Sequence, residues 1–337
     1  MAEYKGIHGT KIQNYTSDPD NPITGQVWYN ETSQTLKFQY PAVTTSGSWR
    51  TGGSLNTARS QTGSSGTQSS TLSSGGYNGT ATTNITESYN GSAWTEVNDL
   101  NTARRTHNQA SVDNTAALAF GGGFPNFANT ESYNGSSWTE VNDLNTARAF
   151  IAAAGTQTLA LAAGGGPPAV GVTESWNGTS WTEVNDLNTA RYLAGNGAGT
   201  QTSAIVAGGS PPTTAVTETW NGTSWTEVND LNTARTHLAL AGTDNTSALA
   251  FGGEVPPFQA VTEVWDGTSW SEQGDLSTAR HYLAGSGTVS AGLAIGGDDT
   301  PVTAATEEWT GAGQPVGAWS TGGSLNTARR QLFSAGT

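Results

Sequence analysis

Histidines, carboxylates and cysteines are the side chains that most often hold metals or carry out catalysis. The chain has no cysteine, which excludes thiolate metal sites, a cysteine nucleophile and disulfides. Its four histidines are His8, His107, His237 and His281. The last three follow an arginine by one to three residues in three different copies of a repeat, so a shared metal would need them to converge from distant segments. We interpret them as polar residues near a solvated opening, and we expect no metal and no cofactor.

Most carboxylates of the chain occupy repeated positions. A catalytic acid–base pair needs two carboxylates in different environments, whereas residues copied in every repeat have equivalent surroundings. The chain also has no phosphate-binding loop, nucleophile elbow or zinc motif. We therefore expect structural carboxylates, no catalytic residue and no enzyme. The repeated series are Glu87, Glu131, Glu174, Glu218, Glu263 and Glu307; Glu96, Glu140, Glu183, Glu227 and Glu272; and Asp99, Asp143, Asp186, Asp230 and Asp275.

A repeat of 43 to 49 residues has to position these side chains. It reads WTEVNDLNTAR at 94–104, 138–148, 181–191 and 225–235. Four strands of about 5–6 residues with their turns fill such a period, so each copy predicts one four-stranded blade. We expect each tryptophan between neighbouring blades, and each arginine to pair with a repeat glutamate or with backbone carbonyls. The two series are Trp49, Trp94, Trp138, Trp181, Trp225, Trp270 and Trp319, and Arg59, Arg104, Arg148, Arg191, Arg235, Arg280 and Arg329.

Tight turns precede the fourth strand of the repeats. Asn-Gly occurs at 90–91, 134–135, 177–178 and 221–222, and Asp-Gly occurs at 266–267. Both dipeptides favour type I′ hairpin turns, in which the two central residues have positive φ. Because no segment has a sustained helical periodicity, we expect an all-β chain.

These residues resemble the kelch repeat. A kelch unit has a double glycine after its second strand, an aromatic residue in the third, a tryptophan at the start of the fourth, and an arginine before the next unit. One unit here has them at Gly252-Gly253, Trp265, Trp270 and Arg280. The resemblance implies a β-propeller like the central domain of the galactose oxidase family, but function varies widely on this fold. The copper enzymes of that family use a tyrosine–cysteine crosslink, which a chain without cysteine cannot form.

The ends of the chain predict how the ring closes. After Arg329 the chain adds only RQLFSAGT, which matches the first strand of a blade, while 25–30, 35–42 and 47–53 read as three further strands. Together they predict a seventh blade that leaves no open sheet edge. We therefore expect seven blades, and the alternative is a six-bladed ring with a separate N-terminal hairpin. The expected division is an N-terminal arm at 1–22 and a propeller at 23–337, with blades at about 59–100, 104–144, 148–187, 191–231, 235–276 and 280–325 and a closing blade of 23–55 plus 329–337.

The loops between the second and third strands differ from blade to blade, unlike the Asn-Gly turns. They read GFPNFANT at 123–130, GPPAVGV at 166–172, SPPTTAV at 210–216 and EVPPFQAV at 254–261. Diverse loops on a uniform scaffold are typical of a recognition surface, and aromatic side chains can stack on sugar rings. The candidate ligand- or partner-binding residues are Phe124, Phe127, Phe258, Tyr192, Tyr282, His107, His237 and His281.

Charge limits the class of partner. The net charge is −14, and the three lysines all lie within the first 37 residues. Such a surface repels phosphate backbones, so we expect no nucleic-acid partner. No apolar run is long enough to span a membrane, so we expect no membrane insertion.

The N-terminal sequence NPITGQVWYNETSQTLKFQ at 21–39 resembles short modules near the start of tail-fibre and other virion proteins of tailed phages, marine phages among them. The resemblance implies a virion appendage that binds a host surface glycan or another virion protein, found on the virion and outside the cell after lysis. The N-terminal arm would then attach it and can make it a homo-oligomer. The alternatives are a cytoplasmic kelch scaffold for protein interactions and a carbohydrate-active enzyme.

Overall fold

The computed structural model describes residues 13–17, 27–32, 34–38, 46–192 and 197–312. The chain divides into two compact units, one of 1–45 with 312–337 and one of Ser46–Gly311. In the first unit, β1 (Gln13–Tyr15) pairs in parallel with β2 (Val27–Asn30), which pairs antiparallel with β3 (Thr35–Phe38). The side chain of Trp28 on β2 is buried.

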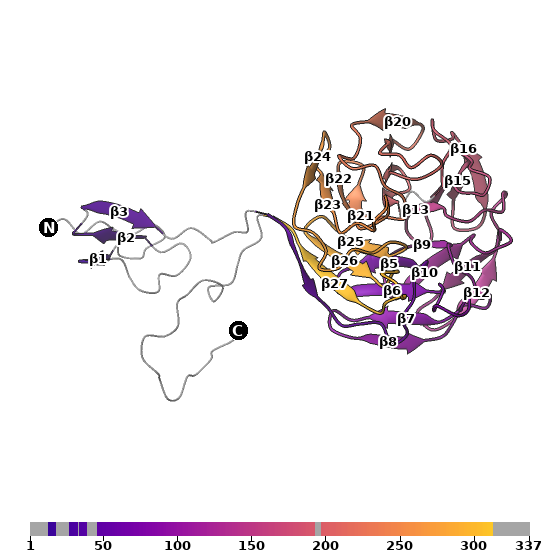
Figure 1. The fold of residues 1–337 in the computed structure, drawn as a ribbon, viewed down its shortest axis with the longest axis horizontal. Coiled ribbons are helices and arrows are strands. Elements are labelled where there is room, and N and C mark those ends of the chain that lie inside the picture. The colour runs from indigo at the N-terminus through magenta and orange to yellow at the C-terminus, as the bar shows by residue number, and fades with distance from the viewer. Residues whose placement is uncertain (1–12, 18–26, 33, 39–45, 193–196, 313–337) are drawn as a thin grey trace. The chain divides into compact units, whose positions relative to one another are not determined.

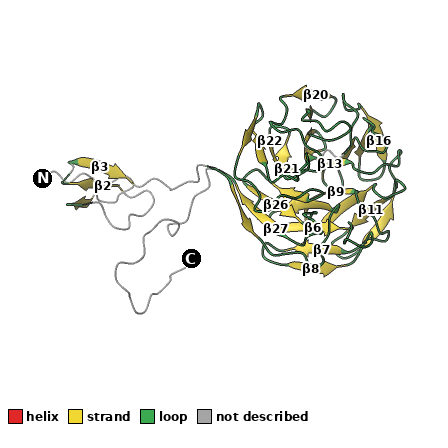
Figure 2. Cartoon of the chain, in the orientation of Figure 1, coloured by secondary structure: helices red, strands yellow, loops and turns green. Residues whose placement is uncertain are grey.

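The second unit is a β-propeller of six four-stranded antiparallel blades. In each blade the first strand lies near the middle of the ring and the fourth lies at the rim, as β9 and β12 do in Figure 1. Figure 2 shows strands and loops throughout, and the described residues include no helix long and apolar enough to cross a membrane.

The blades follow one another along the chain. Blade 1 has β5 (Gly63–Thr67), β6 (Ser70–Ser74), β7 (Thr86–Tyr89) and β8 (Trp94–Val97); blade 2 has β9 (Asn108–Asp113), β10 (Ala116–Phe120), β11 (Thr130–Tyr133) and β12 (Trp138–Val141); blade 3 has β13 (Ala152–Gly155), β14 (Ala160–Ala163), β15 (Thr173–Trp176) and β16 (Trp181–Val184). Blade 4 has β17 (Ala198–Thr200), β18 (Ser203–Ala207), β19 (Thr217–Trp220) and β20 (Trp225–Val228); blade 5 has β21 (Ala239–Asp244), β22 (Ser247–Phe251), β23 (Thr262–Trp265) and β24 (Trp270–Glu272). Blade 6 has β25 (Ala284–Gly287), β26 (Ala291–Ile295) and β27 (Thr306–Thr310), with β4 (Ser48–Thr51) as its fourth strand.

The core lies between blades. In one cluster Leu118 and Phe120 of blade 2 pack with Ile151, Trp176 and Trp181 of blade 3. Inner strands are rich in alanine and glycine, as in AAAG of β13 and ALAA of β14, because six strands converge around the axis and large side chains would not fit there. Tryptophans fill the wider space toward the rim, so the repeat of small inner and large outer residues sets the wedge shape of each blade.

The expectation of seven blades is wrong. Strand β4 pairs with β27, with Trp49 opposite Trp309, and so it completes blade 6 rather than a seventh blade. The Trp49 ring packs against Phe251 and Trp309, and its Nε1 donates to Thr262 Oγ1 of blade 5 at 2.9 Å. The other two strands expected in the closing blade, β2 and β3, pair with each other in the first unit, where β2 also pairs with β1.

The error has a physical reason in the sequence. Segments 47–59 and 317–329 differ only at Ser48, which is Ala318 in the second copy, and at Arg50, which is Ser320. Both carry the tryptophan and arginine that a fourth strand and its following link require, so the pattern alone does not say which copy closes the ring. Trp319, Arg329 and the expected strand at 330–337 lie outside the described residues.

Candidate binding site

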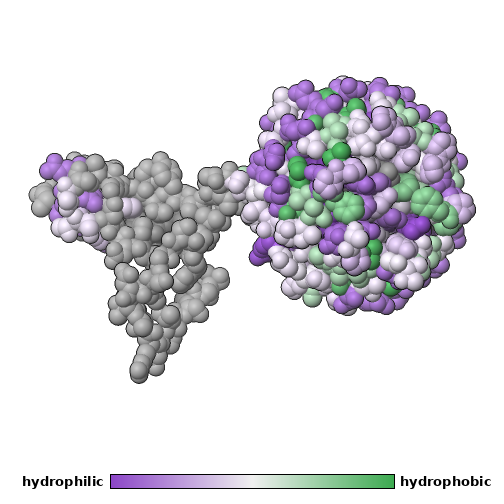
Figure 3. Space-filling view, in the orientation of Figure 1, coloured by the Kyte–Doolittle hydropathy of each residue, from purple (hydrophilic) through white to green (hydrophobic). Residues whose placement is uncertain are grey.

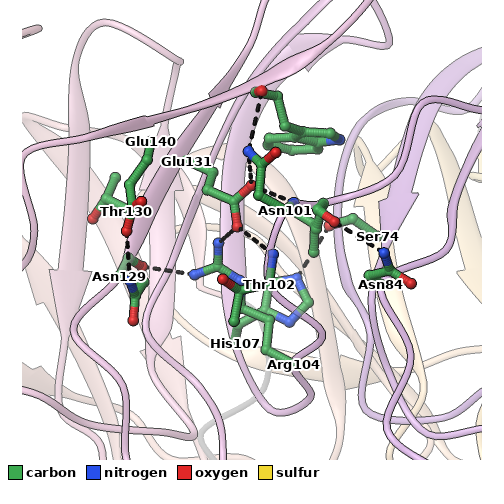
Figure 4. A network of polar contacts seen from close by, with 12 residues as sticks. Ser74, Asn84, Asn101, Thr102, Arg104, His107, Asn129, Thr130, Glu131 and Glu140 are labelled. Carbon is green, nitrogen blue, oxygen red and sulfur yellow. Dashed lines mark hydrogen bonds and ion pairs between the residues drawn. The ribbon is translucent and has the colours of Figure 1, made fainter.

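Buried arginine–glutamate pairs join each blade to the link that precedes it, and Figure 4 shows the pair of Arg104 and Glu131. Arg104 follows blade 1 and pairs with Glu131 on β11 of blade 2, and both side chains are at most 1% exposed. Glu131 also accepts hydrogen bonds from the backbone and side-chain nitrogens of Asn101, at 2.7 and 2.8 Å. The six pairs are Arg59–Glu87, Arg104–Glu131, Arg148–Glu174, Arg191–Glu218, Arg235–Glu263 and Arg280–Glu307.

Burial lowers the pKa of Arg104, and the charge of Glu131 opposes that shift. A buried charge needs a partner, which is why one change in a pair is costly. These repeated arginines and glutamates are therefore occupied in holding blades together.

The repeat tryptophans make the opposite connection, back to the preceding blade. Trp181 of blade 3 donates from Nε1 to Thr130 Oγ1 of blade 2 at 3.1 Å, and its side chain is 5% exposed. Trp94, Trp138, Trp225 and Trp270 make the equivalent bond to Thr306, Thr86, Thr173 and Thr217. Each blade is thus bonded in both directions by side chains that the repeat prescribes.

One end of the ring, here called the turn face, carries the hairpin turns that join strands three and four. In one such turn Asn177 accepts at Oδ1 from the backbone nitrogens of Thr179 and Ser180, both at 2.9 Å. In blades 2 to 5 the turn is also bonded by the blade before it, as where Asn142 Nδ2 donates to Thr179 O at 2.8 Å. The same three bonds recur one blade further on, two to Asn221 Oδ1 and one from Asn185. The turn face is therefore nearly the same from blade to blade.

The other end, here called the loop face, carries the links between blades and the loops between strands two and three. The residue two positions after the arginine has positive φ in five blades, at Gln61, Thr106, Phe150, His237 and Tyr282. Their backbones bond in sequence around the axis, with Thr106 N to Gln61 O at 2.9 Å and Phe150 N to Thr106 O at 2.8 Å. Tyr282 N to His237 O and Gln61 N to Tyr282 O continue the series.

This series of backbone bonds brings side chains of different blades together. Phe150 lies 5.5 Å from Phe124 and 5.8 Å from Tyr192 between ring centroids, and 6.4 Å from His237. His237 lies 3.8 Å from Tyr282. Phe258 stacks on His281 at 4.1 Å, and His281 lies 4.5 Å from Tyr282. We call Phe124, Phe150, Tyr192, His237, Phe258, His281 and Tyr282 the aromatic cluster.

Six of the eight residues expected from the sequence thus lie in one cluster, and two do not. His107 is 4% exposed, bonds Ser74 Oγ through Nε2 at 3.1 Å, and packs against the backbone of Gly63, Gly75 and Gly122 between blades 1 and 2. Burial and the charge of Arg104 hold its pKa well below the ordinary value, so it is neutral and structural. The ring of Phe127 covers Gly123, and the described residues place no ring of the cluster against it.

Carboxylates border one side of the cluster. Glu254 lies 3.3 Å from His237 Nδ1 and 3.9 Å from His281 Nε2. Burial lowers the pKa of His237 to about 3, with a smaller effect from His281, so its contact with Glu254 at neutral pH is a hydrogen bond from a neutral ring. Burial also raises the pKa of Tyr282 to about 12, so this hydroxyl stays protonated. The cluster therefore offers stacking faces together with a neutral His237 ring and a protonated Tyr282 hydroxyl at pH 7.

Sequence reasoning missed Arg105, Tyr77 and Glu254, and its candidates did not include Phe150. The Arg105 guanidinium lies over the rings of Tyr77 and Phe124, at 4.9 and 5.3 Å from their centroids. A signal existed, because Arg104-Arg105 is the only repeat arginine within 46–312 that a second arginine follows.

The axis of the ring offers little space for a ligand. The cavity there has a volume of about 70 Å³ and is lined by residues such as Ser65, Ser111, Ala154 and Ser286. Pockets that hold small molecules are several times larger, at roughly 300–1,000 Å³. Figure 3 shows hydrophobic residues as small patches among hydrophilic and pale ones on the drawn side of the ring. The loop face is therefore the better candidate.

The fold defines the class of protein as a six-bladed β-propeller with an aromatic cluster on its loop face. No protein-family model matches the chain, and no curated protein matches it.

Proposed function

We propose that this chain is a kelch-type recognition propeller without enzymatic activity, and that it binds its ligand through the aromatic cluster of the loop face. The observation that carries the proposal is the cluster itself, because five blades contribute side chains to it from separate loops and links. One repeated series of glutamates is buried in pairs with the repeat arginines, which supports a structural role for both.

We further propose that the ligand is a glycan of a host surface and that the propeller is a virion appendage of a tailed phage. Aromatic faces combined with hydrogen-bonding side chains suit the alternating apolar and hydroxyl surfaces of a sugar. Weak binding at one site would be strengthened by many copies on a particle. The N-terminal arm at 1–22, expected to provide attachment, lies outside the described residues except for 13–17.

The binding proposal is tested with the labelled full chain on a printed array of neutral and acidic oligosaccharides. Phe124 is 51% exposed on the loop face, and Leu159 is 50% exposed in the turn between β13 and β14 on the turn face. Changing each to alanine removes a similarly exposed apolar side chain from opposite ends of the ring. We expect Phe124→Ala to abolish array binding and Leu159→Ala to leave it unchanged. Equal effects of the two changes would contradict the proposal.

The virion assignment has a separate test. Mass spectrometry of purified phage particles should detect peptides of this chain in fixed proportion to known tail proteins. Detection only in the soluble fraction of infected cells would favour an intracellular kelch scaffold.

A further inference from the structure

The arginines of the propeller fall into two groups. Of the eight arginines between 46 and 312, six form the buried pairs with glutamate and Arg50 pairs with Glu308. Arg105 is the eighth, and no described carboxylate lies within ion-pair distance of its guanidinium. No lysine lies between 46 and 312, so Arg105 is the one cation of the described propeller that has no anionic partner. It stands out in a chain with a net charge of −14.

Two aromatic rings hold this guanidinium in place. Tyr77 comes from the loop after β6 in blade 1, and Phe124 comes from the loop after β10 in blade 2. The Arg105 guanidinium therefore contacts an aromatic ring from each neighbouring loop. Stacking engages the flat faces of a guanidinium and leaves the N–H groups on its edge for an acceptor. A half-buried arginine fixed in this way loses little rotamer freedom on binding, unlike a mobile surface side chain.

The charge of the cluster is divided between two sides. Phe124 touches both Arg105 and Phe150, which makes the cation continuous with the aromatic surface. Glu254 lies on the other side, beside His237 and His281. Tyr282 lies within electrostatic reach of both charges, since Glu254 raises its pKa and Arg105 lowers it. A ligand lying across the cluster therefore meets a cation at one end and a hydrogen-bond acceptor at the other.

We propose that the loop face binds the acidic end sugar of a glycan, with the sugar carboxylate on the edge of the Arg105 guanidinium and the sugar ring on Phe124 and Phe150. Carboxylate and guanidinium match in a planar, two-bond geometry. Hydroxyl groups further along the glycan donate to Glu254. The inference rests on the proposed function and deepens it by naming the class of sugar.

With Arg105 on one side of the cluster and Glu254 on the other, the site favours a ligand that carries one acidic group over a ligand that carries many. A polyanion lying across the cluster would place a second carboxylate against Glu254, which repels it. A protein partner is less suited than a sugar, because interfaces between proteins present several large apolar anchors. Phe124 is the only large hydrophobic residue on the described loop face that is about half exposed.

The test compares acidic sugars with their neutral counterparts, using the full chain and titration followed by NMR. The probes are methyl β-glucuronide against methyl β-glucoside and methyl α-galacturonide against methyl α-galactoside. We expect at least one acid to bind about 10-fold more tightly than its counterpart, the factor that a charge-assisted bond of about 1.4 kcal/mol gives. Arg105→Gln should reduce that preference to less than about 2-fold, since the remaining contacts are shared by both sugars.

Arg50→Gln is the matched control, because Arg50 is an exposed arginine that pairs with Glu308 on blade 6. It should leave the preference for the acid unchanged, and thermal melting should show that both variants fold. A preference that survives Arg105→Gln, or no preference for any acid, overturns the inference. If array binding still requires Phe124 in that case, the proposed function stands and only the acidic class is wrong. Arg105-dependent binding of an acidic peptide in place of the sugars would also overturn it.

Discussion

The two faces of the ring are built from the same repeat but differ in what their residues are bonded to. On the turn face the asparagine side chains make bonds that the repeat requires. Asn142 donates to the turn of the neighbouring blade, and Asn177 accepts a backbone bond within its own turn. On the loop face, Phe150 and Tyr192 occupy positions where the repeat prescribes only the backbone. The series of backbone bonds around the axis, from His237 to Phe150 in the described residues, does not depend on which side chain is present. The comparison shows that the side chains of the loop face can change from blade to blade without loss of the bonds that hold the blades together.

The largest effect should come from breaking the connection between blades. Trp181→Ala removes a buried ring and its bond to Thr130, and we expect it to lower the free energy of unfolding by about 3–5 kcal/mol. Chemical denaturation measures the change, with Phe124→Ala as the loop-face counterpart expected to cost less than about 0.5 kcal/mol. A loss below about 1 kcal/mol for Trp181→Ala would show that the blades are not held together in this way.

Acid should destabilise the protein partly through His237 on the loop face. The folded pKa of His237 is about 3 and its ordinary value is 6.5, so the folded state binds fewer protons than the unfolded state between these values. The contribution of His237 to the free energy of unfolding is therefore fully present above pH 6.5 and decreases as the pH falls toward 3. At pH 5 the free energy of unfolding is lower by about 2 kcal/mol. Denaturation at pH 7 and pH 5 should therefore show a smaller acid loss in His237→Gln than in the parent. The same acid loss in both would mean that His237 is protonated freely in the folded protein.

A smaller effect is expected from one bond between turns. Asn185 Nδ2 donates to Thr223 O of the next blade at 2.8 Å near the surface. Asn185→Ala should lower the free energy of unfolding by about 0.5–1 kcal/mol, the usual net value of such a hydrogen bond. Ligand binding by this variant should equal that of the parent, and a loss of binding without a loss of stability would place function on the turn face.

The smallest effect concerns ring closure. Strands β4 and β27 close the ring within the described residues, so removal of 330–337 should change the melting temperature by less than about 2 °C. Trp49→Ala, in contrast, should lower it strongly. A strong drop on removing 330–337 would show that the C-terminal copy of the repeat takes part in closure.

Much of this architecture is predictable from the sequence because the repeat records it. The intervals between tryptophans predict four-stranded blades, and the Asn-Gly pairs predict the positions of the hairpin turns. The expected type I′ geometry is wrong, because only the glycine of each pair has positive φ while the asparagine side chain caps the turn. The number of blades is not predictable in the same way, since 47–59 and 317–329 satisfy the same fourth-strand pattern and only the pairing of Trp49 with Trp309 distinguishes them.

The candidate site was harder to predict because the type of a residue does not reveal where its side chain points in the fold. His107 and His237 follow their arginines by three and two residues, and that single step places one between blades and the other in the cluster. Phe124 and Phe127 come from the same loop, but only Phe124 reaches Phe150. Arg105 was missed because its importance comes from the absence of a carboxylate partner, which only the folded chain shows.

The most direct test of the division between the faces is hydrogen–deuterium exchange with and without a glycan selected from the array. We predict slower exchange on binding in segments 123–128, 149–151 and 281–283, and no change in the turn segments 134–137, 177–180 and 221–224. Protection in the turn segments with none in the loop segments would contradict the account.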